Sequence, residues 1–190
     1  MAATDAITLL TKDHREAETL FGKIEACTGN DDKTLSRKRD LAEEVVTELI
    51  RHSIAEEEYL YPAVRDALPD GDQIADREIS EHSEAEKTMK KLEGLSPDNI
   101  EFDAAFRTLV TQIKAHVSEE EGELFPRLQQ ACTPEQLREL GGKLETAKKI
   151  APTRPHPSSP KTPPGNKMVG PLVGLVDRLR DALTGRGAKR

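Results

Sequence analysis

The sequence is poor in aromatic residues, in cysteine and in long apolar runs. Aromatic side chains make up 3% of its 190 residues, with no Trp, four Phe and two Tyr. Strands favour aromatic and β-branched residues, so this composition disfavours an all-β fold, whereas abundant Glu, Ala and Leu favour helices. Two cysteines do not form a disulfide framework, and no run of about 18 apolar residues could span a bilayer. We therefore expect an all-α protein without a transmembrane segment. Since the N-terminus also lacks a signal-peptide pattern, we expect it to be cytoplasmic.

Positive charge is scarce in most of the chain. The net charge is −7, but residues 151–190 carry eight Lys and Arg against two Asp. That stretch is therefore +6, and residues 1–150 carry −13. Because phosphate contacts need concentrated Lys and Arg, an acidic body argues against a nucleic-acid partner.

Turn signals divide the first part of the chain into four long helical patterns. Hydrophobic periodicity predicts helices over residues 5–27, 34–68, 72–93 and 99–131. Because the connections are short, we expect an up-down-up-down antiparallel four-helix bundle over residues 5–132. A shorter helical extension is predicted over 133–150, capped by Thr133 and weakened by the pair Gly141 and Gly142.

The C-terminal region differs in composition. Residues 151–171 hold seven of the twelve prolines, which predicts an extended, semi-rigid linker. Residues 172–190 are predicted to form a basic amphipathic helix and tail, with an apolar stripe on one face. We expect this helix to hide its stripe on its own bundle, a second subunit or a partner, because few cations flank it for a membrane surface. The stripe consists of Leu172, Leu175, Val176, Leu179 and Leu183.

The bundle contains an internal repeat. Residues 13–25 match 81–93, and residues 52–62 match 116–126, so that histidine and glutamate positions coincide. This pattern indicates a duplicated helical hairpin, which would relate corresponding residues by a pseudo-twofold axis.

Each predicted bundle helix places one histidine in its core-facing seam, and two of the helices add a glutamate one turn later. In H-x-x-x-E the two side chains lie about 40° apart on one helix face. A buried carboxylate needs a cationic partner, and no Lys or Arg lies in the seams at that level. Imidazole with carboxylate suits Fe, Mn or Zn, and two carboxylates between two histidine pairs suit a dinuclear centre. These residues are His14, His52, Glu56, His82, His116 and Glu120.

This arrangement over residues 5–132 resembles the hemerythrin-like HHE cation-binding family. The resemblance implies a non-haem di-iron four-helix bundle with two Fe ions joined by an oxo or hydroxo bridge. In that family the positions of His14, His52, His82 and His116 are terminal ligands, and those of Glu56 and Glu120 bridge the two ions.

One position departs from the oxygen-carrying hemerythrins. They have a further histidine one turn after the first ligand of the third helix, where this chain has Glu86, with Glu18 as its repeat partner. That departure argues against simple oxygen carriage. Each of these two glutamates could be an additional ligand, a hydrogen-bond partner of a bound molecule or a partly solvated residue at the seam edge.

Tyr59 lies two turns after His52, on the same predicted face. It could ligate, donate a hydrogen bond to a bound oxygen species or pack in the core, and packing or donation is favoured over ligation. With Glu123 as its repeat partner, Tyr59 leads us to expect the small-molecule pocket at that end of the site. Four further glutamates are expected on solvated faces: Glu57, Glu58, Glu119 and Glu121.

Several functions suit such a site. The first is a di-iron protein that binds or reacts with O₂, peroxide or NO, by catalase-like turnover, NO handling or sensing; Tyr59 and Glu86 are its candidate catalytic groups. The second is a non-catalytic binding module that stores, donates or senses iron or oxygen. The third is a structural bundle whose basic C-terminal helix recruits a partner.

Overall fold

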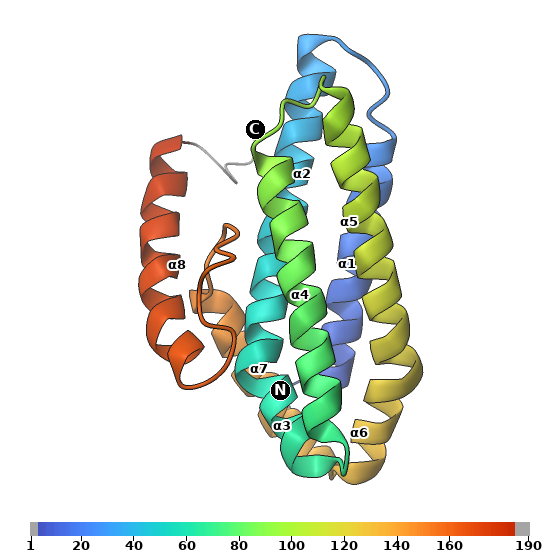
Figure 1. The fold of residues 1–190 in the computed structure, drawn as a ribbon, viewed down its shortest axis with the longest axis vertical. Coiled ribbons are helices and arrows are strands. Elements are labelled where there is room, and N and C mark those ends of the chain that lie inside the picture. The colour runs from blue at the N-terminus through green and yellow to red at the C-terminus, as the bar shows by residue number, and fades with distance from the viewer. Residues whose placement is uncertain (1–3, 185–190) are drawn as a thin grey trace.

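The computed structural model describes residues 4–184, and the expectation of an all-α bundle is confirmed. No strand occurs in that range. Helix α1 packs against α2, and α4 packs against α5, so that two antiparallel hairpins form the bundle (Figure 1). Its helices are α1 (Ala6–Glu25), α2 (Asp32–Ala55), α3 (Tyr61–Ala67), α4 (Gly71–Glu93), α5 (Ile100–Glu119) and α6 (Phe125–Ala131).

Short polar side chains begin three of the long helices. Asp5 accepts a hydrogen bond from the Thr8 backbone N–H, Asp31 from that of Thr34, and Asn99 from that of Glu101. Each bond satisfies a backbone donor that has no partner within the helix. The helix starts that the sequence predicts therefore lie within a few residues of the observed ones.

Two π-helical segments interrupt what the sequence predicts as continuous helices. The first, η1 (Glu56–Leu60), joins α2 to α3, and the second, η2 (Glu120–Leu124), joins α5 to α6. A π-turn contains one residue more than an α-turn, so every side chain after it is displaced around the helix axis. Because each segment begins at a glutamate of the H-x-x-x-E motif, the displacement changes which residues face the site.

Helix α7 (Pro134–Ile150) follows the bundle and packs across α1 and α2. Its start is a capping box in which Thr133 and Gln136 satisfy each other's backbone N–H groups. A Cβ at Gly141 would lie 2.1 Å from the Thr4 carbonyl oxygen. Gly141 therefore permits α7 to approach the start of α1 closely, although a glycine weakens the helix that contains it.

The proline-rich segment is packed against the bundle, and the last helix begins earlier than expected. Ala151, Pro152 and Thr153 are buried. Helix α8 (Gly165–Thr184) contains Pro171, which the sequence analysis places in the linker. The segment 151–164, called the strap below, therefore connects α7 to α8 along the bundle surface (Figure 1).

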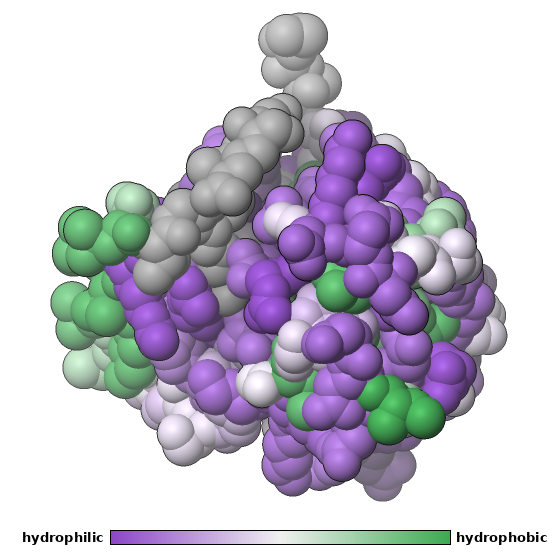
Figure 2. Space-filling model, turned by 90° about the horizontal axis from the view of Figure 1, so that it is seen from above, coloured by the Kyte–Doolittle hydropathy of each residue, from purple (hydrophilic) through white to green (hydrophobic). Residues whose placement is uncertain are grey.

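Helix α8 lies against the rest of the molecule through its polar face. The carboxylate of Asp177, 2% exposed, accepts hydrogen bonds from the backbone N–H groups of Thr153 and Arg154. A Cβ at Gly174 would lie 2.4 Å from the Ile150 carbonyl oxygen, so α8 also approaches the end of α7 closely. The apolar stripe faces outward, where Figure 2 shows hydrophobic side chains along one edge of the molecule. All five of its residues are exposed, and so are Met168 and Val169 at the start of the helix.

Buried apolar residues form two clusters, one on each side of a polar layer. The first includes Phe21, Leu92 and Phe106, and the second includes Leu10 and Leu128. Among residues 4–184, no helix is both long and apolar enough to cross a membrane.

Candidate metal centre

Four buried histidines, one from each long bundle helix, meet in the polar layer. His14 lies on α1, His52 on α2, His82 on α4 and His116 on α5. The Nε2 atoms of His14 and His52 are 3.3 Å apart, and those of His82 and His116 are 3.1 Å apart. The histidines therefore form two pairs, each with both Nε2 atoms turned to the same point.

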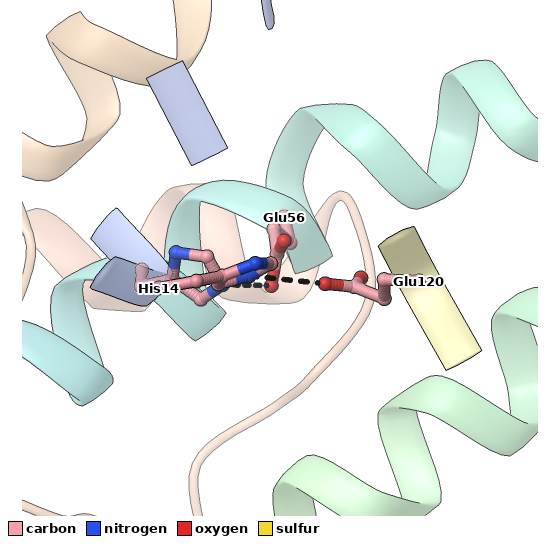
Figure 3. Close-up of side chains that lie close together, drawn as sticks. His14, Glu56 and Glu120 are labelled. Carbon is pink, nitrogen blue, oxygen red and sulfur yellow. Dashed lines mark hydrogen bonds and ion pairs between the residues drawn. The ribbon is translucent and has the colours of Figure 1, made fainter. Parts of the chain in front are cut away.

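Two carboxylates lie between these pairs, and both are 0% exposed. Glu56 Oε2 is 3.1 Å from His52 Nε2 and 3.4 Å from His82 Nε2. Glu120 Oε2 is 3.3 Å from His14 Nε2 and 3.6 Å from His116 Nε2. Each carboxylate thus contacts one histidine of each pair. Figure 3 shows His14, Glu56 and Glu120 converging from three elements.

The six predicted ligand residues form overlapping groups of donor atoms that lie within 4.8 Å of one another. One group joins His14 and His52 to both glutamates, and another joins His82 and His116 to Glu56. A third contains Glu120, His116 and Glu78, a residue that the sequence analysis does not single out. Because both glutamates belong to more than one group, the arrangement has the form of two metal positions that share carboxylates.

Unsatisfied polar atoms show that these residues fit a metal. Both carboxylate oxygens of Glu56, and Oε2 of Glu120, are buried without a hydrogen-bond donor among the described residues. Burying a carboxylate in this way is unfavourable by several kcal/mol unless a cation compensates. Imidazole nitrogen and carboxylate oxygen together suit Fe, Mn or Zn, so a metal ion would satisfy the orphaned atoms.

The outer nitrogen of each histidine contacts a carboxylate. His14 Nδ1 lies 2.8 Å from Glu121, and its repeat partner His82 lies 3.3 Å from Glu57. A carboxylate accepts the Nδ1 proton, which leaves the Nε2 lone pair of the neutral imidazole directed at the site. The expectation that these glutamates are solvated is wrong for Glu57, which is fully buried. Glu121 is only partly exposed.

The other two histidines are held in the same way by residues that the sequence analysis overlooks. His52 Nδ1 lies 3.3 Å from Asp13, and His116 Nδ1 lies 3.1 Å from Glu81 and 2.9 Å from Glu78. Asp13 directly precedes His14 on α1, and Glu81 directly precedes His82 on α4, so the two acidic residues occupy matching positions of the repeat. Their matched acidic character was the signal that could have identified them.

Tyr61, not Tyr59, faces the site. Its hydroxyl lies 3.1 Å from His82 Nε2 and 3.3 Å from Glu120 Oε1. The π-turn of η1 explains the difference, because after Glu56 it brings the fifth residue onto the inner face instead of the third or fourth. Tyr59 is only partly buried, beneath Lys167, whose Nζ lies 4.1 Å from its ring centroid. Glu123 is exposed for the same reason.

The structure places the two further candidate glutamates away from the histidine clusters. Glu18 lies at the surface and forms an ion pair with Arg15. Glu86 is buried but turns toward the strap, where it accepts a hydrogen bond from the His156 backbone N–H and pairs with Lys161. Glu58, predicted to be solvated, is also buried, whereas Glu119 is partly exposed.

Burial and mutual contact shift the pKa values of the cluster in opposite directions. Burial raises the pKa of Glu57 to about 8. Burial lowers the pKa of His52, but Glu56 and Asp13 outweigh it and raise the value to about 10. Burial raises the pKa of Glu120, but His116 and His14 lower it to about 2. Without a metal, histidine protons therefore supply part of the positive charge that the carboxylates require.

A cleft reaches the histidines from the side of the first apolar cluster. Its volume is about 460 Å³, counted out to the surrounding solvent, and Glu16 on α1 and Glu48 on α2 are among the residues that line it. Ala17, Leu49 and Val117 line it beside the histidines. The sequence analysis places the small-molecule pocket near Tyr59 and Glu123, but this cleft lies on the opposite side of the polar layer.

Comparison with known proteins identifies the family to which the bundle belongs. Residues 5–128 match the family model described as the hemerythrin HHE cation binding domain. The chain belongs to this family. The HHE domain thus spans the bundle up to α6, and α7, the strap and α8 follow it.

Individual relatives extend this comparison. An uncharacterized hemerythrin-like protein of Schizosaccharomyces pombe is 30% identical over 173 residues, which cover 90% of this chain and 83% of that protein. A DNA nickase of Nostoc is 27% identical over 140 residues, which cover 74% of this chain but 38% of the nickase. A crystal structure of a hemerythrin HHE cation binding domain-containing protein from Mycobacterium kansasii has the same fold. Its TM-score is 0.63 at 22% identity, over 77% of this chain and 86% of that one.

Proposed function

We propose that this HHE protein is a hemerythrin-like di-iron protein that binds or reacts with O₂, peroxide or NO. The observation that carries the proposal is the pair of buried glutamates shared between two histidine pairs. His14 and His52 would hold one ion, His82 and His116 the other, and Glu56 and Glu120 would bridge them. Bound in this way, iron supplies electron exchange with small oxygen or nitrogen species.

The surroundings of the site support small, uncharged reactants. The cleft is lined by Ala17, Leu49 and Val117 beside the histidines, and such an apolar lining favours small uncharged molecules such as O₂, NO or hydrogen peroxide. The Tyr61 hydroxyl lies within hydrogen-bond reach of His82 and Glu120, where it can hold or donate a proton.

Metal analysis together with peroxide and oxygen assays tests the proposal. The purified chain is expected to hold two irons, and oxygen evolution from peroxide would identify an enzyme. A slow, reversible spectral change with O₂ or NO would instead identify a sensor or storage protein. His52→Ala should lose iron, whereas Lys143→Ala is the control, because Lys143 lies at the surface of α7, paired with Glu139, and outside the donor groups. Fewer than one metal per chain, or unchanged iron in His52→Ala, contradicts the proposal.

A further inference from the structure

The two halves of the repeat differ in how they neutralise the carboxylate next to the bridging glutamate. In one half, Arg15 on α1 pairs with Glu121, which contacts His14. The repeat position of Arg15 on α4 is Ser83, whose hydroxyl donates to the Ile79 carbonyl. Helix α4 therefore offers Glu57, the counterpart of Glu121, no cation at this position.

The strap supplies the missing charge. Lys161 Nζ lies 3.8 Å from Glu57 Oε1 and forms a close ion pair with Glu86. Among residues 4–184, Glu57 forms an ion pair with no lysine or arginine other than Lys161. The Lys161 side chain is 15% exposed, against 51% for Arg15. Water therefore screens the Lys161 contacts much less, and they carry more weight.

Several contacts hold Lys161 in this place. The His156 backbone N–H donates to Glu86 over 2.6 Å, and the Arg154 Nε donates to Asp181 over 2.9 Å. Farther along, Lys167 covers Tyr59 within η1. Residues of the strap and of α8 thus contact η1, the segment that begins with Glu56. One of these contacts is made to Glu57, which faces His82 Nδ1.

We propose that Lys161 is a positioning residue of the metal centre and that the strap forms one wall of the site. Lys161 neutralises the adjacent buried carboxylates Glu57 and Glu86, and Glu57 in turn orients His82. Lys161 thereby pairs with the carboxylate that contacts His82, as Arg15 pairs with the carboxylate that contacts His14. The inference rests on metal binding at this site, and it holds whichever small molecule the metal binds.

Loss of Lys161 would leave two buried carboxylates side by side. Glu57 Oε1 would lose the ammonium group that lies beside it, and the Glu57 side chain would no longer be held against His82 Nδ1. The His82 ring would then lose its fixed orientation. Removing the outer partner of a metal-binding histidine typically lowers metal affinity 10- to 100-fold. We therefore expect Lys161→Met to release metal about 10-fold faster than the parent chain.

Metal release and metal spectra test this role in the full chain. The parent, Lys161→Met, Lys161→Arg and a surface control, Lys143→Met, are loaded with iron, and iron transfer to a chelator is timed. Cobalt(II) loading of the same four proteins then reports ligand geometry through its visible absorption bands. Lys143 pairs with Glu139 on the exposed face of α7, so its substitution makes the same charge change away from the site.

The inference predicts faster iron release and altered cobalt bands in Lys161→Met, near-parent behaviour in Lys161→Arg, and no change in Lys143→Met. Parent-like release and cobalt bands in a folded Lys161→Met overturn it. Faster release with unchanged cobalt bands and no rescue by arginine also overturns it, because that result indicates general loosening. A parent chain that binds no metal contradicts the proposed function instead.

Discussion

The Tyr61 hydroxyl lies 3.1 Å from His82 Nε2, whereas Phe125, at the repeat-related position, stacks its ring against His14 at a centroid distance of 5.8 Å. At this position the two halves of the site therefore differ by one hydroxyl group. Burial, together with the nearby carboxylates Glu56 and Glu120, raises the pKa of Tyr61 well above its ordinary value. Tyr61 thus stays protonated, and it distinguishes the two histidine pairs chemically.

Tyr61→Phe should keep the metal but change its reactivity. Because Phe125 is accommodated in the other half, the ring itself should pack, and the lost hydrogen bond should lower stability by about 1 kcal/mol. The rate with peroxide should fall about 10-fold or more, since the proton donor beside His82 is removed. Metal content and stopped-flow kinetics are the measurements. Tyr59→Phe, outside the site, is the control, and equal rates in the two variants contradict the prediction.

Glu56→Gln should stabilise the metal-free chain while it weakens metal binding. Burial and Glu120 raise the pKa of Glu56, so ionising this carboxyl at neutral pH opposes folding. The neutral amide removes that penalty but is a poor bridging ligand. Thermal unfolding should show a higher melting temperature for the metal-free variant and a lower one for the metal-loaded variant, each compared with the parent chain. Glu16→Gln, an exposed residue paired with Lys12, should change neither, and a lower melting temperature of metal-free Glu56→Gln counts against the prediction.

Metal binding should release protons at pH 7. In the metal-free chain the pKa of His52 is raised to about 10, and Glu120 together with Glu78 raises that of His116 against the lowering effect of burial. Both imidazoles are therefore charged at pH 7, and each must lose its proton to bind a metal. Their raised pKa values stabilise the metal-free fold below pH 6.5, and this contribution is lost as the pH rises through the folded-state values.

Calorimetry in buffers of different ionisation enthalpy measures this release. About two protons per chain are expected at pH 7, and metal affinity should increase from pH 6 to pH 9. His52→Ala should release fewer protons per bound metal, since one of the two donors is gone. A binding heat that is independent of the buffer would show that the histidines are already neutral.

The docking of α8 should depend on its carboxylates and not on its leucines. Asp177→Ala leaves the backbone N–H groups of Thr153 and Arg154 without their acceptor, which should weaken docking by roughly 1–3 kcal/mol. Tryptic cleavage after Lys161 should then accelerate. Leu179→Ala, at a side chain that is 60% exposed, should change stability by less than about 0.5 kcal/mol. Equal protection in both variants contradicts the prediction, and loss of protection in Leu179→Ala alone would mean that the leucines hold the helix.

The sequence alone determined the bundle and the inward position of four histidines and two glutamates. Helical periodicity is local, so residues four apart, such as His52 and Glu56, share a face in any amphipathic helix. Caps such as Asp5 and Thr133 act within one turn, and the helix starts could therefore be predicted. The internal repeat extended the same pattern to both halves.

The tertiary structure alone decided what surrounds those six residues. The π-turn at Glu56 brought Tyr61 to the site in place of Tyr59, because one extra residue per turn displaces every later side chain. Glu57 became buried because α4 and the strap cover it. Lys161 reached Glu86 across 75 positions of the chain, a contact that no local pattern contains. Helix α8 turned its apolar stripe outward because Asp177 satisfies backbone donors of the strap, and hydrogen bonds to those buried groups took precedence over hiding leucine.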